Sequence, residues 1–166
     1  MTNGVRKFVN EILYKGIIPD TFTYTMLNYG YCKAGNIDES IKLRQEMSSK
    51  EGVHASDISD NMLLSSLCKS GRLDEALNLF SETESSGHNP DHITYSILIR
   101  GLCKRGLVEM AFQLYKEMCC KRIIPNIVAH TYILKSFCEK GYICEARVLF
   151  DALINFDLID DIVLGK

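Results

Sequence analysis

The sequence lacks the marks of several large classes of protein. No apolar run among its 166 residues approaches the roughly 20 that a membrane-spanning helix needs. It contains no Cys-x-x-Cys pair, no His-x-Glu motif of the zinc deaminases, no phosphate-binding loop and no nuclease-like cluster of carboxylates. We therefore expect no membrane partner, no enzyme activity and no small-molecule substrate, and neither a cofactor nor a metal.

Positive charge is not in excess either. The chain has 19 lysines and arginines against 21 aspartates and glutamates, so its net charge is −2 at pH 7, and its pI is about 6.1. A basic balance is typical of nucleic-acid-binding domains, so the overall charge counts against that class. The objection weakens if the lysines gather on one face and the acids on another.

Seven cysteines are present, an odd number, and four of them recur at one place. These four, Cys32, Cys68, Cys103 and Cys138, follow one another at intervals of 36, 35 and 35 residues. Each lies in a near-copy of one phrase, such as Gly-Leu-Cys-Lys-Arg-Gly from Gly101. A fixed period near 35 residues indicates a repeat array in which each unit buries its apolar face on its neighbours. We interpret the four cysteines as small core residues in a reducing compartment, and the four histidines as loop or surface residues.

The unit from residue 92 to 126 shows how one repeat is built. Apolar residues recur at helical spacing from Tyr95 to Cys103 and from Val108 to Met118, on either side of Gly106. A glycine suits the left-handed conformation that ends a helix, and Glu109 lies where the dipole of the second helix favours negative charge. Each unit is therefore predicted to be a helical hairpin. Because period-two alternation is absent, the predicted fold class is all-α.

The units divide residues 1–166 into a single array. Residues 1–20 are predicted to be a partial repeat that holds only a second helix. Four complete repeats follow at 21–56, 57–91, 92–126 and 127–161, and residues 162–166 begin an incomplete unit. A small residue recurs where the two helices of a unit must approach closely: Ser40, Ala76, Ala111 and Ala146. The chain can be a natural short protein or part of a longer one.

The stretch that runs from Pro90-Asp91 through Tyr95 and Gly101-Leu-Cys-Lys-Arg-Gly to Pro125-Asn126 resembles the pentatricopeptide repeat. The resemblance covers about residues 5–163 and recurs four times. The rival tetratricopeptide repeat has a tryptophan near its start, and this chain has none. The resemblance implies a right-handed α-solenoid of tandem helix-turn-helix repeats of the pure-repeat class. Its recurrent Gly-Leu-Cys-Lys phrase is similar to that of plant fertility restorers.

Members of this family bind single-stranded RNA, one base per repeat, through a pair of side chains. Carried over by motif, the pairs are Thr25 with Ser56, Asn61 with Asp91, Ser96 with Asn126, and Thr131 with Asp161. The code of the family then implies the sequence 5′-purine-U-A-G-3′, read from the N-terminal repeat onward. The resemblance also implies that Phe22, Ile58, Ile93 and Val128 stack between bases, and that Lys33, Lys69 and Lys104 contact phosphate.

The chemistry of these residue types suits the implied roles. An asparagine such as Asn61 offers a donor and an acceptor to a base edge, and an aspartate such as Asp91 offers acceptors that can orient it. Stacking on an aromatic ring contributes about 1 to 3 kcal/mol per base, and an aliphatic side chain contributes less. Glu139 stands where a fourth lysine would be expected. Three phosphate contacts imply that log affinity falls with log salt at a slope of about −2.

Ordinary structural roles are the alternative for each of these residues. Asp91 and Asn126 can be turn residues before a helix, Asn61 a surface residue, and the lysines charges that face helix C-termini. The repeat at 57–91 also departs from the pattern, since Asp60 replaces the expected tyrosine and Ala55 the expected proline.

The sequence therefore predicts a module that binds single-stranded RNA in organellar RNA processing, stability or translation. The alternative is a protein-protein interaction scaffold of the helical-repeat type, and protein partners stay open in either case. The family alone implies the mitochondrion, with the chloroplast as the alternative. Residues 1–16 contain Glu11 and do not read as an acid-free targeting peptide.

Overall fold

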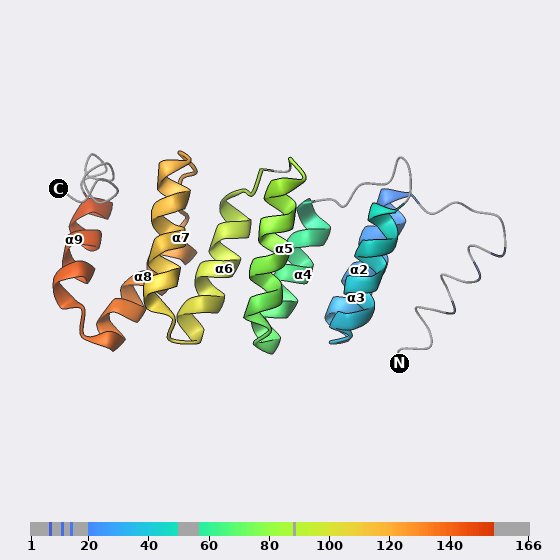
Figure 1. Ribbon diagram of the computed structural model, residues 1–166. Helices are drawn as coiled ribbons and strands as arrows, with labels where there is room; N and C mark the ends of the chain where they lie inside the picture. Colours follow the sequence, from blue (N-terminus) through green and yellow to red (C-terminus); the bar gives the residue numbers. More distant parts are fainter. Residues whose placement is uncertain are drawn as a thin grey trace. The chain divides into compact units, whose positions relative to one another are not determined.

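The computed structural model describes residues 7, 11, 14, 20–49, 57–87 and 89–154. Within these residues it contains eight α-helices and no strand, which confirms the all-α class (Figure 1). The chain divides into two compact units, Met1–Glu82 and Thr83–Lys166, and each is considered by itself. Most of the predicted partial repeat at 1–20, the recognition residues Ser56 and Asp161, and the unit begun at 162–166 lie outside the described residues.

Unit 1 contains the first two hairpins. Its helices are α2 (Thr21–Lys33), α3 (Ile37–Ser48), α4 (Asp57–Ser70) and α5 (Leu73–Ser85), the last turn of which belongs to unit 2. Helix α2 packs against both α3 and α4, and α3 also packs against α4. Each complete repeat thus supplies a first helix and a second helix, as the sequence predicted.

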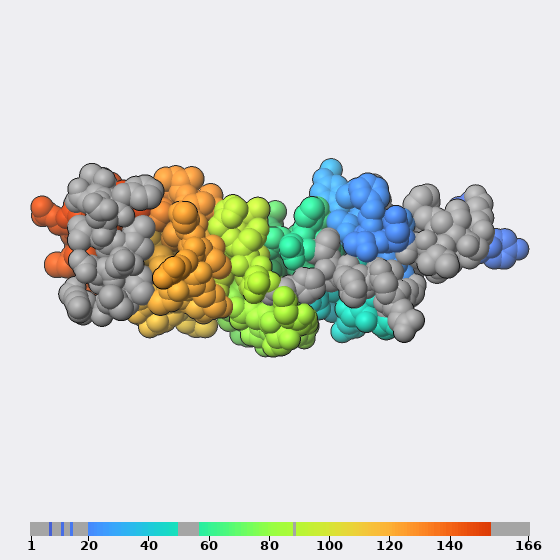
Figure 2. Space-filling model, turned by 90° about the horizontal axis from the view of Figure 1, so that it is seen from above, coloured from blue at the N-terminus to red at the C-terminus, as the bar shows by residue number. Residues whose placement is uncertain are grey.

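Unit 2 contains the next two hairpins in the same order. Its helices are α6 (His92–Lys104), α7 (Val108–Cys120), α8 (Ile127–Lys140) and α9 (Ile143–Ile154). Helix α6 packs against α7 and α8, and α8 packs against α7 and α9. In the space-filling view the yellow-green and orange residues of this unit lie directly side by side (Figure 2). The apolar face of one hairpin is therefore covered by the next, which is the packing expected of a repeat array.

Local chemistry explains where the first helices begin and end. Asp20 Oδ1 accepts from Thr23 N at 2.8 Å, and Asn126 Oδ1 accepts from Ala129 N at 3.0 Å, so both residues cap a helix N-terminus. After the first helices, Gly106 and Gly141 have φ of 72° and 78°. This left-handed conformation is unfavourable for side chains with a Cβ, so the predicted glycine stop is confirmed.

A tyrosine–glutamate hydrogen bond ties the two helices of hairpins one and three. Tyr24 Oη donates to Glu46 Oε1 at 3.1 Å, and Tyr95 Oη donates to Glu117 Oε1 at 2.8 Å. Burial and the bond to Glu117 raise the pKa of Tyr95 to about 12, so its hydroxyl stays protonated and remains a donor. The small residues predicted at the close approach of the helices are all buried: Ser40, Ala76, Ala111 and Ala146.

Two expectations about single residue types were wrong. Cys103 is buried and Cys32 and Cys68 are half-buried, but Cys138 is exposed. Cys103 is covered by the following first helix, where it bonds to Ser136, whereas no helix after α9 lies within the described residues to cover Cys138. All seven cysteines are free thiols.

His130 was expected at the surface and is instead buried, with only 9% of its area exposed. It stands where Tyr24 and Tyr95 stand in other repeats, and it packs edge-on against Tyr115 with 5.5 Å between ring centroids. Ala152 stands where hairpins one and three have the glutamate that bonds the tyrosine. His130 Nε2 is therefore buried without a hydrogen-bond partner. Burial lowers the pKa of His130 and keeps the ring neutral.

Candidate nucleic-acid interface

An exposed apolar side chain occupies the second position of every first helix. These residues are Phe22, Ile58, Ile93 and Val128, and their exposed fractions are 70%, 62%, 46% and 38%. Single exposed apolar residues are ordinary, but here they recur at one register in four helices whose neighbouring turns bury apolar residues. The structure therefore places all four predicted stacking residues at the surface, on corresponding turns of the first helices.

Three positions later lie the predicted base-reading residues. The hydroxyls of Thr25 and Thr131 donate to the carbonyl oxygen four residues earlier, at 2.8 Å to Thr21 and 2.7 Å to Ile127. This back-bond holds the side chain against its own helix. Thr131 is exposed, Asn61 is half-buried, and Thr25 is buried with 6% of its area exposed.

Ser96 is also buried, because its predicted partner lies over it. Ser96 Oγ is 2.8 Å from Asn126 Oδ1, and it is 2.5 Å from His92 O. Asn126 therefore joins two helices, since the same Oδ1 caps α8 through Ala129 N. Both bonds use the oxygen of the amide, which leaves the Nδ2 donors for another acceptor. These two residues form the one predicted recognition pair that lies wholly within the described residues of one unit.

Asp91 is both a helix cap and a predicted recognition residue. Its Oδ1 accepts from Ile93 N at 3.0 Å, from Thr94 N at 2.9 Å and from Thr94 Oγ1 at 2.9 Å. Burial alone would raise the pKa of Asp91, but the hydrogen bonds from Thr94 outweigh it and lower the pKa below its ordinary value. The cap accounts for Oδ1, so the alternative structural role holds for one oxygen and leaves the other for a ligand.

The three predicted phosphate-binding lysines lie in the last turns of the first helices. Lys33, Lys69 and Lys104 are all exposed. Lysine side chains on a helix lean toward its N-terminus, and Lys33 Nζ lies 5.7 Å from the centre of the Tyr29 ring, one turn earlier. This lean directs the charge toward the base-reading turn. In α8 the corresponding Glu139 pairs with Lys135 at 3.7 Å.

Charge is divided between the two kinds of helix. Counting lysine and arginine against aspartate and glutamate, the first helices α2, α4, α6 and α8 carry +1, −1, +2 and +1. The second helices α3, α5, α7 and α9 carry −1, −4, −1 and −1. The first helices thus total +3 and the second helices −7. The acidic pI comes from the second helices, which weakens the objection raised by overall charge.

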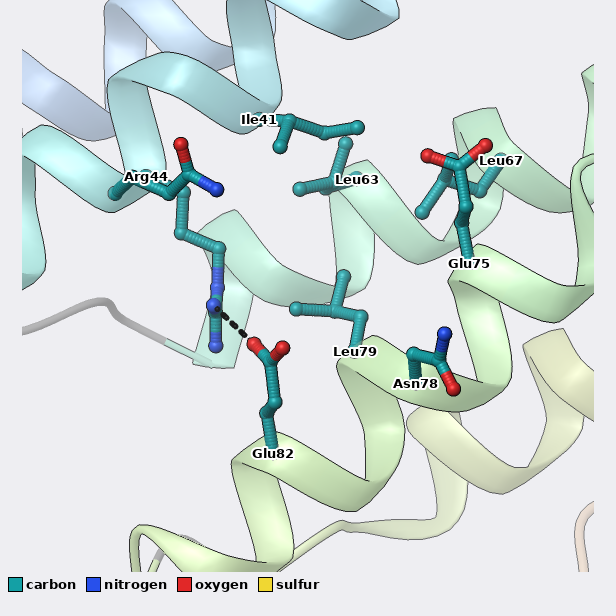
Figure 3. Close-up of a pocket in the computed structure, with 9 residues that line it drawn as sticks. Ile41, Arg44, Leu63, Leu67, Glu75, Asn78, Leu79 and Glu82 are labelled. Atoms are coloured by element: carbon teal, nitrogen blue, oxygen red, sulfur yellow. Dashed lines mark hydrogen bonds and ion pairs between the residues drawn. The ribbon is translucent and has the colours of Figure 1, made fainter.

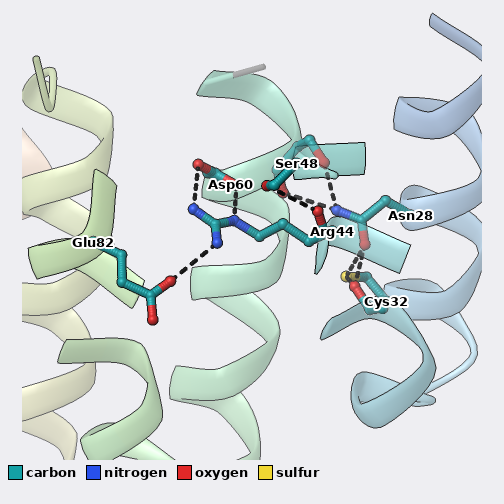
Figure 4. A network of polar contacts seen from close by, with 8 residues as sticks. Asn28, Cys32, Arg44, Ser48, Asp60 and Glu82 are labelled. Atoms are coloured by element: carbon teal, nitrogen blue, oxygen red, sulfur yellow. Dashed lines mark hydrogen bonds and ion pairs between the residues drawn. The ribbon is translucent and has the colours of Figure 1, made fainter. Parts of the chain in front are cut away.

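An ion pair that sequence analysis missed lies next to Asn61. Its neighbour Asp60 is buried and pairs with Arg44 of α3, with 2.7 Å between Asp60 Oδ1 and Arg44 Nε (Figure 4). Arg44 Nη1 also lies 3.1 Å from Glu82 Oε2. Asp60 replaces a tyrosine, and Arg44 replaces the aromatic residue that other repeats have as Phe80, Tyr115 and Phe150. The signal that could have revealed this pair was the coincidence of two departures in adjacent repeats.

In the described part of the chain, no three His, Cys, Asp or Glu side chains are grouped so that they could hold a metal ion. Helices long and apolar enough to cross a membrane are likewise absent from the residues that the structure describes.

Comparison with known proteins connects these features. The PPR repeat family model matches residues 55–104 and 97–139, and the PPR repeat model matches residues 15–48. A chloroplastic pentatricopeptide repeat-containing protein of Arabidopsis thaliana is 33% identical over 96 residues, which are 58% of this chain and 12% of that protein. The chain therefore spans a small part of this relative.

Solved structures show the same fold. The pentatricopeptide repeat protein PPR10 from maize has a TM-score of 0.77 and 23% identity, over 95% of this chain and 22% of that one. PPR10 in complex with an 18-nt psaJ RNA element has a TM-score of 0.75 and 24% identity, over 95% of this chain and 23% of that one. The PPR domain of Arabidopsis thaliana protein-only RNase P 1, in complex with tRNA, has a TM-score of 0.75 and 12% identity, over 97% of this chain and 87% of that domain. The fold class is accordingly an all-α solenoid of tandem helical hairpins.

Proposed function

Because the chain belongs to the pentatricopeptide repeat family, we propose that it binds single-stranded RNA through its first helices, one base per repeat. The observation that carries the proposal is the recurrence of an exposed apolar residue at the second position of all four first helices. These side chains keep a large share of their apolar area in contact with water, and a base sandwiched between two of them removes that area from water.

The proposal is one of binding rather than catalysis. The implied site is 5′-purine-U-A-G-3′, with Asn61 and Asp91 reading uracil, Ser96 and Asn126 reading adenine, and Thr131 and Asp161 reading guanine. Thr25 and Ser56 would read the purine. The contact between Ser96 and Asn126 supports the assignment of these two residues to one base, because the hydrogen bond fixes the amide that would face the base edge.

The biological setting follows from the family. We propose that the protein acts on organellar RNA, in processing, stability or translation. We place it in the mitochondrion, with the chloroplast, which the Arabidopsis relative supports, as the alternative. Imaging of the full gene product fused to a fluorescent protein distinguishes the two organelles.

A change of code tests the base assignment directly. We expect the double substitution Ser96→Asn with Asn126→Asp to copy the uracil-reading pair of the preceding repeat, and the Asn126→Asp change retains a good helix cap. Fluorescence anisotropy with oligomers that differ only at the third base should show the preference move from adenine to uracil by roughly tenfold.

A second substitution separates phosphate contacts from base reading. Lys104→Glu should weaken binding to all oligomers alike and reduce the salt slope, because a phosphate contact carries no sequence information. Either of two results would contradict base-by-base reading: an unchanged adenine preference in the double variant, or equal binding of 5′-AUAG, its scrambles and duplex RNA by the parent.

A further inference from the structure

A hollow opens in unit 1 on the side of the second helices, away from the proposed RNA-binding row. It measures about 200 Å³ and lies between α3, α4 and α5 (Figure 3). Its apolar lining comes from Ile41, Leu63, Leu67 and Leu79, and charged side chains stand around it. An apolar cavity of about 150 Å³ is large enough for benzene. The hollow therefore has room for one aromatic ring beside these four aliphatic side chains.

Unit 2 shows what fills this space elsewhere in the same chain. Aligned on the glycines that end the first helices, Ile41 corresponds to Phe112 and Leu67 corresponds to Phe137. The rings of Phe112 and Phe137 contact each other edge to face, with centroids 5.0 Å apart. Unit 1 has an aliphatic residue at both positions, so the hollow lies where unit 2 has a pair of rings in contact.

The charges around the hollow are mainly negative, which favours a ring flanked by basic side chains. Helix α5 carries four acids and no base. Two of the acids, Glu75 and Glu82, line the hollow together with Arg44 and have 46% and 65% of their side chains exposed. Glu75 pairs with Arg72 and Glu82 pairs with Arg44. The three helices around the hollow, α3, α4 and α5, carry −1, −1 and −4, so the surroundings stay acidic with both arginines counted. They are seven residues apart, which places them on one face of α5 with a separation of about 10 Å along the axis. At the corresponding positions unit 2 has Glu145 and Ala152, so one of the two acids is absent there.

We infer that this hollow is a docking site for a basic amphipathic helix of a partner protein, which inserts one aromatic side chain between α3 and α5. The ring buries its apolar area against Ile41 and Leu67, and arginines one helical turn on either side of it meet Glu75 and Glu82. A buried aromatic anchor with flanking charges is a common arrangement at protein–protein hot spots. This site is separate from the RNA-binding row, so it can be tested independently of the proposed function.

The direct test is a titration with a labelled alanine-based helical peptide that carries one phenylalanine and an arginine one turn to either side. We expect saturable binding to the chain that weakens as salt is added, because the flanking contacts are between exposed charges. A peptide with alanine in place of the phenylalanine should bind at least tenfold more weakly. Equal binding of the two peptides, or no binding of either, would overturn the proposal.

Two kinds of protein variant place the peptide in the hollow. Ile41→Phe fills the space with the ring that unit 2 has at this position, and it should weaken the peptide at least tenfold while RNA binding is unchanged. Glu75→Gln with Glu82→Gln leaves the apolar lining intact and should remove most of the salt dependence, which keeps the test valid if Ile41→Phe fails to fold. Peptide binding that is the same in both variants as in the parent would place the peptide elsewhere and reject the site.

Discussion

In each unit the two hairpins meet at corresponding positions of the repeat, but the side chains at these positions differ in chemistry between the units. In unit 1 the junction of the first two hairpins is polar, because Asn28 Nδ2 donates to Ser59 Oγ at 2.6 Å in the core and Asn28 Oδ1 accepts from Ser40. In unit 2 the corresponding positions are Ile99, Ala129 and Ala111, and all are apolar. A second pair of positions also differs, since the ion pair of Arg44 and Asp60 in unit 1 corresponds to the aromatic pair of Tyr115 and His130 in unit 2.

The junction also carries one matched pair at its edge. Arg72 Nη1 lies 2.7 Å from Asp38 Oδ1 in unit 1, and Tyr142 Oη donates to Glu109 Oε1 at 2.9 Å in unit 2. In both contacts, the residue that follows the glycine stop of a first helix meets the second helix of the preceding hairpin. The backbone repeat therefore determines which positions meet between hairpins. The residues at those positions can form an ionic, polar or aromatic contact, provided that both members of the pair change together.

The largest effect is expected at the ion pair. Arg44→Tyr alone should destabilise unit 1 by about 3 kcal/mol, because it leaves the buried Asp60 carboxylate without its partner. The double substitution Arg44→Tyr with Asp60→His copies the junction of unit 2 and should recover most of the loss. Urea unfolding followed by circular dichroism measures both, and additive effects of the two substitutions would show that the positions are not coupled.

A smaller effect is expected in the amide network. Asn28→Ile should cost about 2 kcal/mol, since Ser40 and Ser59 lose a buried hydrogen-bond partner. Adding Ser40→Ala and Ser59→Ala makes the junction apolar as in unit 2, and should bring the free energy of unfolding to within about 1 kcal/mol of the parent. Native-state hydrogen exchange of α2 and α4 reports the change locally. A triple variant that is less stable than Asn28→Ile would show that the polar residues of unit 1 cannot be replaced together by the apolar residues of unit 2.

Lowering the pH should affect the stability of the two units differently, because His130 is buried in unit 2. Its pKa is lowered by burial, so the unfolded chain binds the proton more readily than the folded chain as pH falls below about 6.5. Stability of unit 2 is therefore complete above that pH and declines below it, by up to about 1.4 kcal/mol for each unit of pKa depression. His130→Tyr with Ala152→Glu restores the tyrosine–glutamate pair of hairpins one and three and should remove the decline. Hydrogen exchange of α8 at pH 7.5 and pH 5.5 measures it.

The smallest effect is expected at the edge pair. Arg72→Gln should change stability by less than about 1 kcal/mol, because Arg72 is only half-buried, Asp38 is exposed and salt screens the pair. Tyr142→Phe at the matching position should have a similarly small effect that does not depend on salt. A large loss in either variant would mean that the edge pairs, and not the buried positions, hold successive hairpins together.

Much of this arrangement could be predicted from the period of the sequence. Recurrent residues such as Gly106 and Ala111 have local roles, a left-handed stop and a close helix approach, and both roles follow from residue type and spacing. The register of Phe22, Ile58, Ile93 and Val128 came instead from the resemblance to the pentatricopeptide repeat, which implies an exposed residue at this position of each first helix.

Contacts between repeats could not be predicted in this way. Arg44 and Asp60 compensate for each other across sixteen residues of sequence, and each by itself reads as a surface charge. The burial of Ser96 depends on Asn126 in the next repeat, and the burial of His130 depends on Tyr115 in the preceding one. Such contacts are set by how the hairpins stack, which a repeat pattern does not encode.

The unequal charges of the first helices have a kinetic consequence. The first helices of unit 2 together carry +3, and the first helices of unit 1 together carry no net charge. A polyanion diffusing toward the chain is attracted more strongly to unit 2, so we expect the 3′ half of a bound strand to be captured first and the 5′ half to settle afterwards. Removing charge at Arg100 or Lys104 should then slow association, whereas a change at Phe22 should shorten the lifetime of the complex.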